Sequence, residues 1–147
     1  MPSASIKKII PCEKNQLIDM VLDIERYPEF VPWCLEGKIH KKNETKDLIE
    51  IKGDLKVGNR FIHETYSSLV LFYKKEDKII VTNIDGPVKK LSNIWKFKSI
   101  NNSTQLEFEI NFELKNNLFN IIMKRSFKFG LKKITDAFEE RAVKLYK

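Results

Sequence analysis

The stretch Tyr27-Pro28-Glu29-Phe30-Val31-Pro32-Trp33-Cys34 carries two prolines and three aromatic side chains within eight residues. It comes directly after a segment with helical periodicity. Prolines stop a helix and fix the backbone, while aromatic side chains supply a large apolar area at a low entropy cost. Because the stretch contains no obvious catalytic group, we interpret it as the rigid apolar mouth of a binding site, and the protein as a binder rather than an enzyme.

The residues before this stretch have the spacing of a short helix. Apolar side chains recur there at intervals of four and three, which predicts a helix over 13–26 that Pro28 ends. A second short helical turn through Phe30 and Trp33 is expected next, with a proline near its start.

A long helix is predicted over 117–146, at the C-terminal end. At about 1.5 Å per residue it is roughly 40 Å long, which is about the width of a domain of this size. Gly130 lies inside it at a cost of about 1 kcal/mol relative to alanine, and should mark a bend or a close approach. The apolar stripe of this helix consists of Phe119, Met123, Phe127, Leu131, Ile134, Phe138, Ala142 and Leu145.

Between these helices, from 35 to 114, the apolar residues recur with a period of two. The clearest case is 104–114, where apolar and polar residues alternate throughout, as in an antiparallel strand with one buried face. With a further strand at 5–10, the turn signals divide the chain into seven strands. These signals are Lys52-Gly53-Asp54, Gly58-Asn59, Lys75-Glu76-Asp77, Asp85-Gly86-Pro87 and Asn101-Asn102-Ser103.

This order of elements predicts an α+β fold in a single domain over 1–147: a seven-stranded curved antiparallel sheet wrapped around the long C-terminal helix, with two short helices after the first strand. The concave face of such a sheet is wider than one helix can fill, so we expect a cavity beside the helix. Three elements should surround it: the proline-rich stretch, the clearest strand and the long helix. The predicted ligand-binding residues are therefore Phe30, Trp33, Phe108, Phe112, Phe127 and Leu131.

Residues with obvious chemistry are scarce. His40 and His63 have no partners at metal-ligand spacing, the five glycines form no phosphate loop, and no local signature of a catalytic triad is present. We therefore expect no catalytic residue, no metal and no cofactor. The two cysteines, the absence of a signal peptide and the absence of an apolar run of about 20 residues favour a reduced, cytoplasmic protein.

The formal net charge of +7 favours anionic partners such as RNA or acidic lipid. The excess of lysine over arginine is equally typical of an AT-biased genome, so both interpretations stay open. On the long helix, Lys124, Arg125, Lys128 and Lys132 form a basic stripe opposite the apolar one. This stripe is either an ordinary solvated face or a contact surface for membrane or ribosomal RNA phosphates.

Several stretches together resemble the coenzyme Q-binding protein family, which has the START-like helix-grip fold of the polyketide cyclase and lipid transport superfamily and includes the bacterial ribosome-association toxins. The resemblance covers nearly the whole chain in order and spacing. Val88 stands where the family usually has phenylalanine, and 52–66 matches only loosely. The matching stretches are Tyr27–Cys34, Asp85-Gly86-Pro87, Trp95-Lys96-Phe97, Asp136–Ala142 and Leu145-Tyr146.

The resemblance implies one of two functions. The first is binding of ubiquinone or a similar long-chain lipid, as a carrier or chaperone that supports respiratory electron transport from the cytoplasm and the periphery of the inner membrane. The alternative is a ribosome-association toxin that binds the large ribosomal subunit and blocks subunit joining. A cyclase-type enzyme would need polar residues at the base of the cavity, and we expect none there.

Overall fold

The structure is a computed structural model that describes residues 3–58, 61, 63–85, 88–114 and 117–147; the side chains of 88–89, 112, 114 and 117–128 lie outside this description. Seven strands and three helices follow one another along the described chain. They are β1 (Ser3–Ile10), α1 (Lys14–Leu22), the 3-10 helix η1 (Ile24–Glu29), β2 (Cys34–Glu44), β3 (Leu48–Gly58), β4 (His63–Tyr73), β5 (Lys78–Asp85), β6 (Val88–Ile100), β7 (Ser103–Leu114) and α2 (Asn117–Tyr146).

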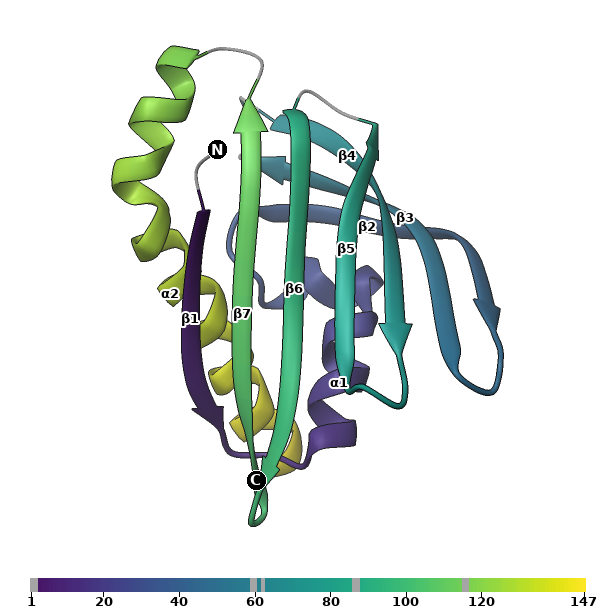
Figure 1. Cartoon of the computed structure of the whole chain (residues 1–147). Helices are drawn as coiled ribbons and strands as arrows, with labels where there is room; N and C mark the ends of the chain where they lie inside the picture. The colour runs from purple at the N-terminus through teal and green to yellow at the C-terminus, as the bar shows by residue number, and fades with distance from the viewer. Residues whose placement is uncertain (1–2, 59–60, 62, 86–87, 115–116) are drawn as a thin grey trace.

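All seven strands belong to one antiparallel sheet in the order β1-β7-β6-β5-β4-β3-β2. The three helices lie behind the sheet in Figure 1, on its concave side, with α2 next to β1. This architecture confirms the predicted seven-stranded curved sheet wrapped around a C-terminal helix.

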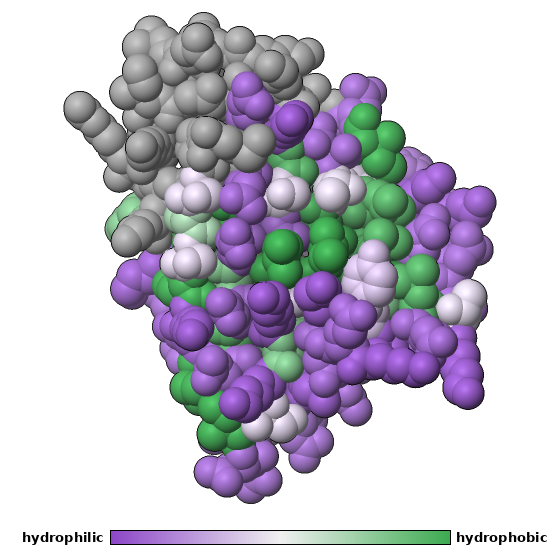
Figure 2. Space-filling view, in the orientation of Figure 1, coloured by the Kyte–Doolittle hydropathy of each residue, from purple (hydrophilic) through white to green (hydrophobic). Residues whose placement is uncertain are grey.

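The period-two pattern of 104–114 has the expected consequence. Leu106 and Phe108 are buried against the helices, while Glu107 and Glu109 alternate with them on the outer face. Figure 2 shows the side of the molecule that faces the viewer in Figure 1, where hydrophilic side chains surround a central apolar area. The sheet therefore has one face in the core and one face in water.

The first helical segment differs from its prediction. A capping box between Glu13 and Gln16 starts α1, but the helix ends at Leu22, because Asp23 leaves the helical backbone region. The second short helix is η1, which precedes Phe30 and contains Pro28. The break at Asp23 turns the chain so that Ile24 faces the sheet.

Gly53 does not form the turn predicted at 52–54. It lies within the continuous strand β3, where a Cβ would lie 2.5 Å from Ile24 Cδ1 and 2.9 Å from the Lys38 carbonyl oxygen. At Gly37 on β2, a Cβ would lie 2.1 Å from the Ile24 carbonyl oxygen. Both glycines mark the close approach of η1 to the sheet, the other common role of a glycine in a strand.

Of the other four predicted turns, two are confirmed and two include residues that the structure does not describe. Asp77 and Asn101 have left-handed backbones (φ 50° and 55°) in the turns between β4 and β5 and between β6 and β7, so these two predicted turns are confirmed. Asn59, Gly86 and Pro87, from the other two signals, lie outside the described residues.

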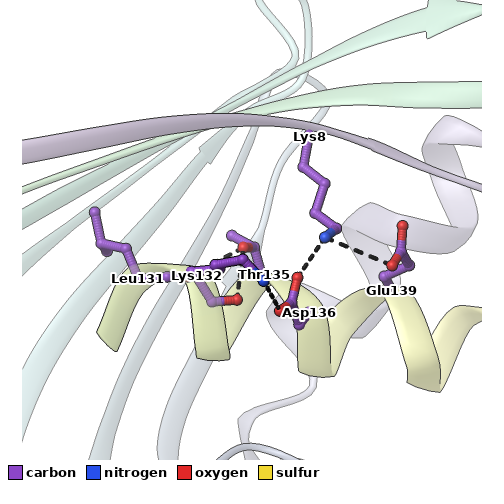
Figure 3. Close-up of polar contacts among 6 residues, drawn as sticks. All are labelled: Lys8, Leu131, Lys132, Thr135, Asp136 and Glu139. Atoms are coloured by element: carbon purple, nitrogen blue, oxygen red, sulfur yellow. Dashed lines mark hydrogen bonds and ion pairs between the residues drawn. The ribbon is translucent and has the colours of Figure 1, made fainter. Parts of the chain in front are cut away.

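The C-terminal half of α2 is tied to β1 and η1 by charged groups. The Lys8 ammonium donates to Asp136 and lies 3.5 Å from Glu139, and Asp136 also accepts from Lys132 at 2.8 Å (Figure 3). The hydrogen bond to Asp136 raises the pKa of Lys8. Hydrogen bonds from Lys132 and Lys8 lower the pKa of the Asp136 carboxyl. The same segment of α2 reaches η1 through Arg141, which donates to Glu29 at 3.0 Å.

Gly130 lies inside α2 as predicted, but not at a close approach. A Cβ built on it would meet no atom of the described residues within 4 Å. Thr135, five residues further on and fully buried, instead keeps its hydroxyl inside the helix by donating to the Leu131 carbonyl at 3.0 Å.

The glycines give a stability prediction. Gly37→Ala should lower the free energy of unfolding by about 2–3 kcal/mol, because the new methyl group overlaps a backbone carbonyl that cannot rotate away. Gly130→Ala should raise it by about 0.5–1 kcal/mol, because alanine is the better helix former and the space is open. Urea unfolding of both variants checks this. Equal effects at the two positions would contradict the close approach of η1.

Candidate functional site

A cavity of about 240 Å³ lies between the concave face of the sheet and the helices. Among the described residues, every helix and every strand except β1 contributes to its lining. The lining is almost wholly apolar. An engineered apolar cavity of about 150 Å³ can hold benzene, whereas pockets for drug-sized ligands start near 300 Å³. This cavity therefore fits a substituted ring, and a long tail on that ring would have to leave through the mouth.

Aromatic rings form the rigid floor of the cavity. Trp95 on β6 lies against Phe108 of β7 with ring centroids 4.1 Å apart and ring planes tilted by 36°, and the centroid of Trp95 lies 5.3 Å from that of Phe138 on α2 in an edge-to-face arrangement. Phe138 also contacts Tyr27 at 5.8 Å and Phe30 at 5.1 Å. One buried ring thus joins the helix, the sheet and the proline-rich stretch.

Trp33 marks the mouth. It is 47% exposed, and the other described lining residues are buried or half-buried. Its backbone is left-handed (φ 65°) and its carbonyl oxygen accepts from the Gly58 amide at 2.8 Å. This conformation costs an aromatic residue about 1–3 kcal/mol, and strained backbone of this kind clusters at active sites and ligand-binding sites. Trp33 thus has the position that the sequence predicted; its contact with a ligand stays a prediction.

Two polar side chains reach the lining, contrary to the sequence-based expectation. Ser68 of β4 and Asn93 of β6 both line the cavity. Asn93 Oδ1 accepts from Trp95 Nε1 at 2.7 Å. The sequence contained an indication of the Asn93 position, because Asn93 lies two residues before Trp95 and therefore points to the same face of the strand.

The other predicted lining residues are distributed unevenly. Phe108 lines the cavity with Trp33. Phe30 lies instead beneath the Arg141 guanidinium, in a separate surface hollow of about 230 Å³. Leu131 is buried in the core without lining the cavity; α2 contributes Ile134 and Phe138, which lie further along the same helix.

The remaining site predictions lie largely outside the described residues. They concern the side chains of Phe112 and Phe127, and of Lys124, Arg125 and Lys128 from the basic stripe. Lys132, the described member of that stripe, is 66% exposed and pairs with Asp136. Its charge is therefore already partly compensated.

Both cysteines are free and buried, and Cys34 lines the cavity. Burial raises the pKa of each thiol to about 11, so both stay protonated at neutral pH. Within the described part of the chain, no three histidine, cysteine or acidic side chains gather as metal ligands. The described helices also include none with the length and apolarity to cross a bilayer.

Comparison with known proteins gives relatives along the whole chain. A family model described as polyketide cyclase / dehydrase and lipid transport matches residues 10–139. The ribosome association toxin RatA of Rickettsia prowazekii is 30% identical over 143 residues, which cover 95% of each chain. The mitochondrial coenzyme Q-binding protein COQ10 of Dictyostelium discoideum is 32% identical over 136 residues, which cover 90% of this chain and 64% of that protein.

A solved structure shows the same architecture. A START superfamily protein from Mycobacterium smegmatis superimposes with a TM-score of 0.84 over 99% of both chains. At 18% identity this likeness concerns the fold alone. Together with the relatives, it confirms the family resemblance and the START-like helix-grip fold that the sequence predicted.

The cavity thiol gives a testable prediction. In a Cys12→Ser variant, the remaining thiol Cys34 should react with iodoacetamide at neutral pH at least about 100-fold more slowly in the folded protein than in urea, because two pKa units separate the folded and ordinary values and burial limits access. Mass spectrometry of the alkylated protein over time measures both rates. Similar rates in the two states would show that Cys34 is not enclosed.

Proposed function

Because this chain belongs to the polyketide cyclase / dehydrase and lipid transport family, we propose that it binds ubiquinone or a similar long-chain lipid in the apolar cavity. In this proposal the protein is a carrier or chaperone that supports respiratory electron transport, and not an enzyme. It acts from the cytoplasm and meets the periphery of the inner membrane when it exchanges lipid.

The observation that carries the proposal is an apolar cavity, sized for one ring, with an exposed tryptophan at its mouth. A buried aromatic ring removes about 150–250 Å² from water, which corresponds to roughly 4–6 kcal/mol before the costs of association. A ring alone would therefore bind at about millimolar strength or weaker. Contact between the lipid tail and Trp33 would supply the missing affinity.

The relatives support a binding role. One is named as a coenzyme Q-binding protein and another as an association toxin, so neither name describes a catalyst. The family description also includes cyclases, whose chemistry would need reactive groups in the cavity. Here the polar groups of the lining residues are hydroxyls, an amide, a thiol that stays protonated and indole N–H groups, and no histidine or carboxylate is among the described lining residues.

A quinone titration tests the proposal. Decylubiquinone should quench the fluorescence of Trp95, which lies in the cavity floor. Trp33→Ala should weaken binding by roughly 1–3 kcal/mol, because it removes buried apolar contact at the mouth. Ile84→Ala is the control, since Ile84 is exposed on β5 and is not a lining residue.

Organic extracts of the purified wild-type protein should also contain quinone by mass spectrometry. If neither extraction nor titration detects a quinone or another lipid, the carrier function is wrong. If wild type binds and folded Trp33→Ala binds equally well, Trp33 has only a structural role.

A second candidate function is association with the large ribosomal subunit. It is favoured by the toxin relative, which this chain matches over nearly the full length of both. It is also favoured by like charges on the outer face of the sheet, where Lys41 of β2 lies directly opposite Lys52 of β3 and Lys38 is exposed nearby. Like charges in direct cross-strand register destabilise a sheet, although lysines on an edge strand also block pairing with other chains.

Sedimentation of ribosomal subunits tests this second candidate. Wild-type protein would shift the profile toward free subunits, and the shift would weaken steeply with added salt. Replacing Lys41 and Lys52 by glutamine should reduce the effect more than replacing Lys132, because Lys41 and Lys52 oppose each other while Lys132 is already paired with Asp136. An unchanged profile with wild-type protein would exclude ribosome blocking.

A further inference from the structure

Resting on the proposed function, we infer that the cavity selects a ring bearing carbonyl oxygens, and that Asn93 and Ser68 are the hydrogen-bond donors that recognise them. The ligand class is thus an oxidised quinone rather than its quinol or a hydrocarbon lipid. The lining supplies few other polar groups, so the side chains of these two residues decide which polar head can enter.

The orientation of the Asn93 amide is fixed by its neighbour. An indole N–H can only donate, so the Asn93 atom that accepts from Trp95 Nε1 must be Oδ1. The amide nitrogen Nδ2, with two N–H donors, is therefore left over. Within the described part of the chain it has no hydrogen-bond partner, and the same holds for the Ser68 hydroxyl.

These two groups are not sealed inside the protein. Among the described residues, no enclosed side-chain nitrogen or oxygen lacks a partner. Asn93 and Ser68 both line the cavity, so their unpaired donors are accessible from it. An unpaired polar group beside an apolar cavity favours a ligand atom that can accept from it.

Both donors lie on the concave face of the sheet, at different depths. Ser68 of β4 pairs with Asn83 of β5, and Asn93 of β6 pairs with Val81, two residues away, so the two backbones are about 12 Å apart. Ser68 lies opposite Gly53, five residues along β3 from Gly58, which holds Trp33. At about 3.3 Å per residue, Ser68 lies roughly 16 Å along the sheet from Gly58, and Asn93 about 7 Å deeper. A quinone would thus enter ring first, with its tail passing Trp33.

The chemistry discriminates between redox forms. Both quinone oxygens accept hydrogen bonds, which matches the Nδ2 donor. A quinol oxygen can also accept, but each of its two O–H groups needs an acceptor, and the side chains of these two residues offer only the Ser68 hydroxyl oxygen and the Asn93 Oδ1 that already accepts from Trp95. Sites that pair a substrate's polar group reject an analogue that leaves that pairing unmade. One unmade hydrogen bond should weaken quinol binding about tenfold.

The experiment compares three probes on the full chain, with calorimetry as the readout, or with Trp33 fluorescence in the variants that lack Trp95. They are decylubiquinone, its quinol, and a decyl-substituted dimethoxytoluene that lacks both quinone oxygens. Wild type should bind decylubiquinone about tenfold or more tightly than either analogue.

A set of variants distinguishes the effect of the two donor side chains from the effect of losing the Trp95 indole. Asn93→Val alone would leave the buried Trp95 N–H without an acceptor. It is therefore combined with Trp95→Phe, so that the double variant lacks both partners of that hydrogen bond. Trp95→Phe alone is the matched control: it frees the Asn93 amide to turn, so it should keep the preference over the toluene analogue and lose part of the preference over the quinol. Ser68→Ala should reduce the preference for the quinone, and the Asn93→Val, Trp95→Phe double variant should abolish most of it while the toluene analogue still binds.

Each outcome decides a different point. If the double variant keeps the tenfold preference, or if wild type binds all three probes equally, the donors do not recognise the ligand and this inference is wrong while lipid binding stands. If wild type binds none of the three, the lipid-binding function fails and the inference fails with it.

Discussion

The closeness of η1 to the sheet determines the rest of the structure. Ile24 can lie against β2 and β3 only because Gly37 and Gly53 carry no Cβ in its path. This contact brings Tyr27 and the proline-rich stretch over one end of the concave face, where Phe138 of α2 meets Tyr27. The cavity is the space that the sheet, η1 and α2 leave unfilled once these contacts are made.

Leaving that space empty is costly. Side chains that line such a cavity forgo the packing contacts that a closed core would give them. The fold also retains a left-handed tryptophan at the mouth and two donors without partners in the described structure. A ligand with a ring, acceptor oxygens and an apolar tail would fill the cavity, pair the donors and cover Trp33, which is why we favour lipid binding over a role for the outer surface alone.

Local patterns in the sequence predicted most of the fold. The bounds of α2 and the period of β7 follow from spacing alone, because each depends on one face of one element. The prediction of a turn at Gly53 was wrong. In the sequence, a glycine that forms a turn cannot be distinguished from a strand glycine that leaves room for a distant side chain, here that of Ile24. The lining residues were only partly predictable. Leu131 and Ile134 lie on the same apolar stripe of α2, and the position of the helix along the sheet decides which of the two faces the cavity. The free Asn93 donor depends on a contact with Trp95 that spacing suggests but does not establish.

Nuclear Overhauser contacts between bound decylubiquinone and the protein test the central claim most directly. We expect contacts from the ring methyl and methoxy protons to Trp95 and Phe108, and from the tail to Trp33, because these side chains form the floor and the mouth of the cavity. Contacts confined to outer-face residues such as Leu71 and Ile80, with none to Trp95, would contradict a ligand site inside the fold.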